Sequence, residues 1–85
     1  MRITKRRPLH VGEVLHLEFM QPMGLTVLEL AHLLDIQDSQ AQELLNGHPI
    51  SEEMATRLAS AFGNTPEFWS KLQLAVDQWR TKEVN

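Results

Sequence analysis

The residues best suited to chemistry lie in one polar stretch, 37–43, where amide, hydroxyl and carboxylate side chains surround a single alanine. Glutamine can both donate to and accept from adenine, serine can bond to several bases, and a carboxylate accepts from the amino group of cytosine. On the first turns of an exposed helix, such side chains can reach base edges in the major groove of DNA. The candidate base-reading residues are Gln37, Asp38, Ser39, Gln40 and Glu43.

A short helix is predicted directly before this stretch. Thr26 and Glu29 have the spacing of a capping box, in which each side chain accepts from the other residue's backbone N–H. The apolar residues that follow recur at helical spacing and would form the inward face of the helix: Val27, Leu30, Ala31 and Leu34.

The polar stretch itself is predicted to form a second short helix. It is expected to begin at Asp38 or Ser39 and to end before Asn46-Gly47. Ser39 and Gln42 again have capping-box spacing, which makes Ser39 a candidate N-cap.

The three residues between the two helices, Asp35-Ile36-Gln37, predict a sharp corner. Helices joined by so short a turn cross steeply, which requires a small residue at the closest approach, and Ala31 fits that place. Asp35 can adopt the left-handed conformation of the turn, and Ile36 can fill the corner. These features together predict a helix-turn-helix over about 26–46.

Helix signals also recur in the rest of the chain, and no long alternating run predicts a strand. Boundary residues predict three more helices: one closed by Pro22 and Gly24, one between Ser51 and Gly63, and one that starts at Thr65-Pro66 and ends near Arg80. The expected fold is all-α, a compact five-helix domain over 9–82, preceded by a flexible basic arm over 1–8.

Charge is strongly segregated along the 85 residues, although the formal net charge is only −3. Residues 8–70 hold nine acids against one base, Arg57, so the reading stretch has no nearby lysine or arginine. A basic arm on an acidic body suggests a partner touched by the arm, although a solubilising tail is the alternative. The candidate contacts to DNA phosphate are Arg2, Lys5, Arg6, Arg7, Thr26 and Asn46.

Several function classes are disfavoured by what the sequence lacks. It has no cysteine, its four histidines have no metal-ligand spacing, and no serine has the surroundings of a nucleophile. We therefore expect no enzyme activity, no cofactor and no bound metal. No apolar stretch approaches the length of a membrane span, so we expect a cytoplasmic protein without a membrane partner.

The last predicted helix is apolar over an unusually wide stripe. A stripe this wide has more apolar surface than one small core can bury, which predicts a homodimer in which this helix takes part. Packing in the monomer's own core is the alternative for its tryptophans. The candidate interface residues are Phe68, Trp69, Leu72, Val76 and Trp79.

With these motifs in place, the chain resembles the HigA-type addiction-module antidote proteins, a branch of the XRE (λ-repressor-like) helix-turn-helix group. The resemblance covers 9–79, and its most specific part is the run Phe62-Gly63-Asn64-Thr65-Pro66-Glu67-Phe68-Trp69. Other segments similar to the family are His10-Val11-Gly12-Glu13, Pro22-Met23-Gly24-Leu25-Thr26, Asn46-Gly47, Ile50-Ser51, Arg57-Leu58, Leu72-Gln73 and Trp79.

The resemblance implies the antitoxin of a type II toxin–antitoxin module. Such a protein neutralises a cognate HigB-type ribonuclease toxin and binds operator DNA as a dimer to repress its own operon. Two alternatives stay open: a stand-alone helix-turn-helix repressor, and a protein-interaction module that has lost DNA binding because its reading helix is acidic.

Overall fold

Five helical stretches and no β-strand make up the part of the chain that the computed structural model describes, residues 8–84. The first stretch consists of α1 (Val11–Leu15), a π-helical segment η1 (His16–Met20) and α2 (Gln21–Met23). The others are α3 (Val27–Leu34), α4 (Asp38–Leu45), α5 (Glu52–Phe62) and α6 (Pro66–Val84). The predicted all-α, five-helix fold is confirmed, but α6 continues to Val84 instead of ending near Arg80.

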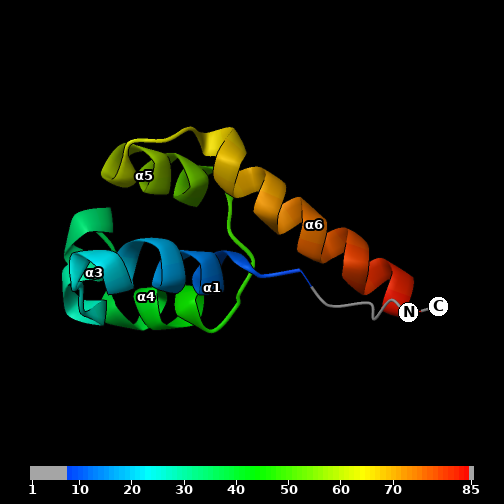
Figure 1. The fold of residues 1–85 in the computed structure, drawn as a ribbon, viewed down its shortest axis with the longest axis horizontal. Helices are drawn as coiled ribbons and strands as arrows, with labels where there is room; N and C mark the ends of the chain where they lie inside the picture. Colours follow the sequence, from blue (N-terminus) through cyan, green and yellow to red (C-terminus); the bar gives the residue numbers. More distant parts are fainter. Residues whose placement is uncertain (1–7, 85) are drawn as a thin grey trace.

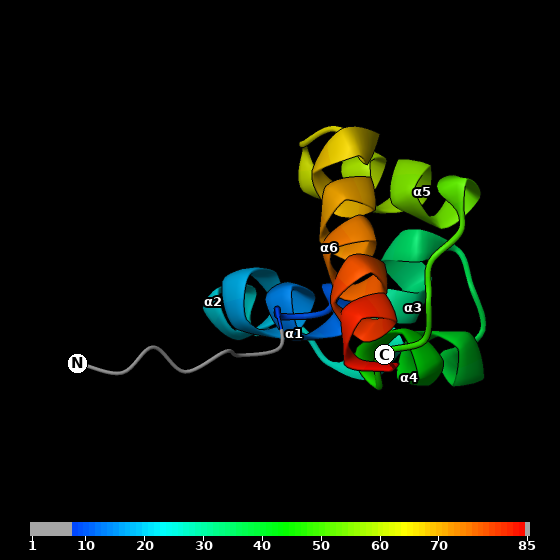
Figure 2. The same ribbon diagram turned by 90° about the vertical axis from the view of Figure 1, so that its right-hand side faces the viewer.

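The helices form a small body from which α6 projects. In Figure 1, α5 lies above α3, α4 and α1, and α6 slants away so that its C-terminal half lies beyond the other helices. Figure 2, turned by 90°, shows α3, α4 and α5 on one side of α6 and α2 on the other. None of the helices described is long and apolar enough to cross a bilayer.

Most helix boundaries follow the predicted capping residues. The Glu29 backbone N–H donates to Thr26 Oγ1 at 3.2 Å, and the Thr26 backbone N–H donates to Glu29 Oε1 at 2.9 Å, so the capping box of α3 is confirmed. Ser51 caps α5 by accepting from the Met54 backbone N–H at 3.1 Å. Gly63 ends α5 at φ 74°, a conformation that glycine adopts without strain.

The first stretch contains a wider turn that the sequence pattern does not predict. In η1 the Gln21 backbone N–H donates to the His16 carbonyl, five residues back, instead of four. Pro22 follows directly, and its ring conflicts with the carbonyl four residues before it in a regular α-helix. The π turn relieves that conflict, so Pro22 lies inside the helical stretch and Gly24 ends it.

The start of α1 packs directly on the end of α4. His10 and Glu13 form a capping box, in which the Glu13 backbone N–H donates to His10 Nδ1 at 3.1 Å. Gly12 is buried, and a Cβ atom there would lie 2.7 Å from the Cα of Leu45. Only glycine allows the two backbones to approach this closely. This packing is the structural reason for a glycine in the His10–Glu13 segment.

The hydrophobic core joins the first stretch to α3, α4, α5 and α6, with Trp69 at 0% exposure. The ring centroid of Trp69 lies 5.4 Å from that of Phe19 and 4.9 Å from that of Phe68. Its indole Nε1 donates to Asn64 Oδ1 at 2.6 Å, so its polar atom is satisfied although the ring is buried. The core thereby fixes α6 against the body that carries α3 and α4.

Candidate nucleic-acid interface

The corner between α3 and α4 has the predicted helix-turn-helix geometry. Asp35 lies in the left-handed region at φ 57° and ψ 49°, and ends α3. The Ile36 backbone N–H then donates to the Ala31 carbonyl at 3.0 Å, which closes the turn. Ala31 is 2% exposed and Ile36 packs against the core, as their predicted places require.

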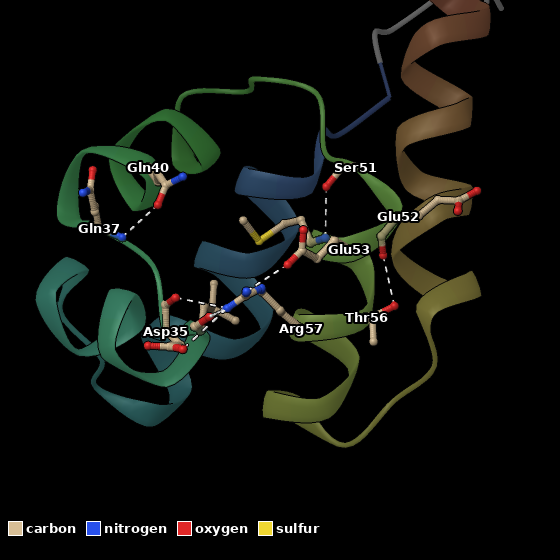
Figure 3. Close-up of polar contacts among 10 residues, drawn as sticks. Asp35, Gln37, Gln40, Ser51, Glu52, Glu53, Thr56 and Arg57 are labelled. Atoms are coloured by element: carbon tan, nitrogen blue, oxygen red, sulfur yellow. Dashed lines mark hydrogen bonds and ion pairs between the residues drawn. The ribbon is translucent and has the colours of Figure 1, made fainter.

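Arg57 of α5 holds this corner from the outside (Figure 3). Its Nη1 donates to the carbonyl oxygens of Leu34 at 2.8 Å and Asp35 at 3.0 Å. Its Nη2 donates to Glu53 Oε2 at 2.9 Å, which fixes the direction of the guanidinium. The last carbonyls of α3 thus receive donors from another helix, and the angle between α3 and α4 is tied to α5.

The N-terminus of α4 is capped differently from the prediction. Gln37 is the N-cap residue, with an extended backbone at φ −76° and ψ 155°, and its N–H donates to Gln40 Oε1 at 2.9 Å (Figure 3). Ser39 already lies within the first turn of the helix, so the expectation that it caps α4 is wrong. This contact fixes the orientation of the Gln40 amide group, and its amide nitrogen stays available as a donor.

All predicted base-reading side chains lie on the exposed surface of α4 and its N-cap residue. Ala41 and Leu44 turn inward at 0% and 3% exposure and seat α4 on the core. The five predicted base readers are all exposed to solvent: Gln37, Asp38, Ser39, Gln40 and Glu43. The structure therefore places the predicted base-reading residues close together at the start of a helix that the core holds in place.

Gln42 is an exposed residue of α4 that the sequence analysis did not include among the readers. It follows Ser39 by three residues and precedes Asn46 by four, a spacing that places all three on one helix face. Capping-box spacing predicts Gln42 as a partner of Ser39, whereas helical spacing predicts that the two residues share an exposed face.

The predicted phosphate contacts are divided between described and undescribed parts of the chain. Thr26 is exposed at the start of α3, and Asn46 is exposed at the end of α4. Because Thr26 Oγ1 accepts from a backbone N–H, its own hydroxyl hydrogen is left to donate to a phosphate oxygen. The remaining predicted contacts lie outside the described residues: Arg2, Lys5, Arg6 and Arg7.

The exposed surface of α4 is acidic. Asp38 and Glu43 are both exposed on α4. The one base between residues 8 and 70, Arg57, directs its guanidinium to the carbonyls of α3. Within this range, attraction to phosphate must therefore come from backbone N–H groups and neutral side chains.

The predicted dimer surface on α6 is partly used within the monomer. Trp69 and Val76 are 0% and 3% exposed, so their assignment to an interface is corrected: both are already buried by the chain's own helices. Phe68 is 40% exposed, and Leu72 and Trp79 are half-buried. Leu74, which the sequence analysis did not include, is 54% exposed on the same helix.

Comparison with known proteins shows which family the chain belongs to. The family model described as "Helix-turn-helix" matches residues 17–69. Antitoxin HigA-1 of Vibrio cholerae serotype O1 is 48% identical over 82 residues, which is 96% of this chain and 78% of that protein.

Two solved structures share both the fold and much of the sequence. An addiction-module antidote protein of the HigA family from Coxiella burnetii has a TM-score of 0.78 and 41% identity, over 85% of this chain and 79% of that one. The Pseudomonas aeruginosa antitoxin HigA, solved with the higBA promoter, has a TM-score of 0.88 and 29% identity, over 93% and 87%. The chain therefore belongs to the XRE-type helix-turn-helix family, within its branch of HigA-like antitoxins.

Proposed function

We propose that this protein binds the operator of its own operon through the outer face of α4 and represses transcription. The observation that carries the proposal is the exposed row of hydrogen-bonding side chains on α4, held at a fixed angle by Arg57 and the core. The solved complex of the Pseudomonas aeruginosa relative with promoter DNA supports it. In this proposal Gln37, Asp38, Ser39 and Glu43 face base edges, while the amide oxygen of Gln40 caps the first turn of α4.

The operator is proposed to be read by a homodimer. A helix-turn-helix dimer meets two half-sites one helical turn of DNA apart, which adds the contacts of two short reading helices. The exposed apolar part of α6 supports this arrangement, and Phe68, Leu72 and Trp79 are the interface residues we propose.

Deleting residues 2–7 should weaken operator binding and reduce its dependence on salt. For every phosphate that the shortened chain no longer neutralises, the slope of log K against log salt becomes shallower by about 0.9. The measurement is an anisotropy titration of promoter DNA at several salt concentrations, with the intact chain as control. Equal affinity and equal slope for both chains would show that the arm makes no phosphate contacts.

Neutralising a basic ribonuclease toxin is the second part of the proposed function. The excess of carboxylates over bases in residues 8–70 supports a basic partner, since complementary charge speeds encounter and selects the partner. The contact is proposed to draw on these carboxylates: Glu13, Glu18, Asp35, Asp38, Glu43, Glu52 and Glu53.

Co-expression with the cognate ribonuclease toxin should restore growth that the toxin alone arrests. The two purified chains should also form a complex at low salt that weakens as salt is raised. Growth arrest that persists at full expression of the folded antitoxin, with no complex at low salt, would contradict neutralisation.

A protein-interaction module without DNA binding is the second candidate function. The acidic surface of α4, with Arg57 directed inward, is the observation that favours it. Toxin binding without any shift of promoter DNA would support this candidate against the first.

A further inference from the structure

We infer that Gln42 is a specificity-determining residue that reads an adenine in each operator half-site, and that Gln40 acts instead as a capping residue. The inference rests on the proposed operator binding and names the base that one exposed side chain of α4 recognises. It exchanges the roles that residue spacing alone predicts for the two glutamines.

Gln42 lies on the outward side of α4. Ala41 and Leu44 define the inward face of α4. The exposed residues that share a stripe on the other side are Ser39, Gln42, Glu43 and Asn46, at spacing i, i+3, i+4 and i+7. Reading helices of the homeodomain class contact bases through side chains with this same spacing.

The side-chain amides of Gln40 and Gln42 differ in the hydrogen bonds that they make. Gln40 Oε1 accepts from the Gln37 backbone N–H at 2.9 Å and satisfies the first turn of α4. Gln42 is exposed, and its side chain makes no hydrogen bond to any part of the chain that the structure describes. Its amide oxygen and amide nitrogen are therefore both available to a ligand.

The edge of adenine in the major groove is complementary to a glutamine amide. Adenine presents a donor at N6 and an acceptor at N7 in the major groove, and a glutamine amide matches both when neither of its groups is engaged. Gln42 meets that condition, whereas the amide of Gln40 is held in place by the contact of its oxygen with the Gln37 backbone N–H. The neighbouring Glu43 can only accept, so it does not compete with Gln42 for adenine.

The test compares Gln42→Ala with the matched variant Gln40→Ala on the same helix. Each full-length protein is used to select binding sites from randomised duplexes flanking a promoter core. Wild type is expected to require an A·T pair at one position per half-site, and Gln42→Ala to lose that preference by about tenfold to a hundredfold while the other positions stay selective. Gln40→Ala is expected to keep the preference and to unfold at a lower temperature, because it loses the cap.

A modified base gives a second and independent readout. Replacing the selected adenine by 7-deazaadenine removes the N7 acceptor, so wild type should bind less tightly and Gln42→Ala should show no further loss. An unchanged A·T preference in folded Gln42→Ala would overturn this inference and leave the operator function standing. A wild-type protein without any sequence preference would overturn the proposed function, and this inference with it.

Discussion

Replacing Gly12 by alanine is expected to lower the free energy of unfolding by about 3 kcal/mol, the upper range for overpacking a core. The new Cβ atom would lie 2.7 Å from both the Cα and the carbonyl oxygen of Leu45. These atoms belong to the backbone, so the clash is relieved only by moving α1 away from the end of α4. Operator affinity should fall together with stability, because α1 supports the reading helix. Urea denaturation followed by circular dichroism measures the loss.

Gly24→Ala is the matched control for this change. Gly24 has φ 69°, and nothing lies within 4 Å of a Cβ atom built on it. Alanine there meets only the cost of the left-handed backbone, about 1 kcal/mol. Alanine in an open helix position stabilises relative to glycine by about 0.5–1 kcal/mol. A stabilised Gly12→Ala protein would therefore contradict the close packing of α1 on α4.

Replacing Arg57 by alanine is expected to lower the free energy of unfolding by about 2 kcal/mol, since two carbonyls then lack the hydrogen bonds of a charged donor. The guanidinium donates to Leu34 at 2.8 Å and Asp35 at 3.0 Å, and its side chain is 35% exposed. With the corner released, operator affinity should fall at temperatures where the variant is still fully folded. Chemical denaturation and an operator titration at low temperature measure the two effects.

Two further variants separate the contacts of Arg57 with the α3 carbonyls from its ion pair with Glu53. Arg57→Lys keeps the charge but lacks the forked donors, so it should recover only part of both losses. Glu53→Ala removes an exposed i, i+4 ion pair and should cost about 0.5 kcal/mol or less. If Arg57→Ala unfolds no more easily than Glu53→Ala, the contacts to α3 do not hold the corner.

The helix-turn-helix was predictable because its signals are local. The capping box at Thr26, the left-handed Asp35 and the small Ala31 each lie within a few residues of the structure they cause. The inward and outward faces of α4 followed from helical spacing for the same reason.

The features that the sequence analysis missed depend on contacts between distant residues or on competing local choices. Arg57 reaches carbonyls 22 and 23 residues away, and no spacing rule connects them. The burial of Trp69 depends on Phe19 and Phe62 arriving from other helices. At the start of α4, spacing predicts a capping box of Ser39 and Gln42, whereas the extended backbone of Gln37 places the N-cap two residues earlier.

The central claim is that the outer face of α4 recognises the promoter of the operon that encodes this protein. A fluorescence anisotropy titration tests it, with a promoter duplex and a scrambled duplex of equal length and composition at the same physiological salt concentration. We expect the promoter to be bound at least about a thousandfold more tightly, the lower limit usual for specific protein–DNA complexes. Equal affinity for the two duplexes would contradict the account.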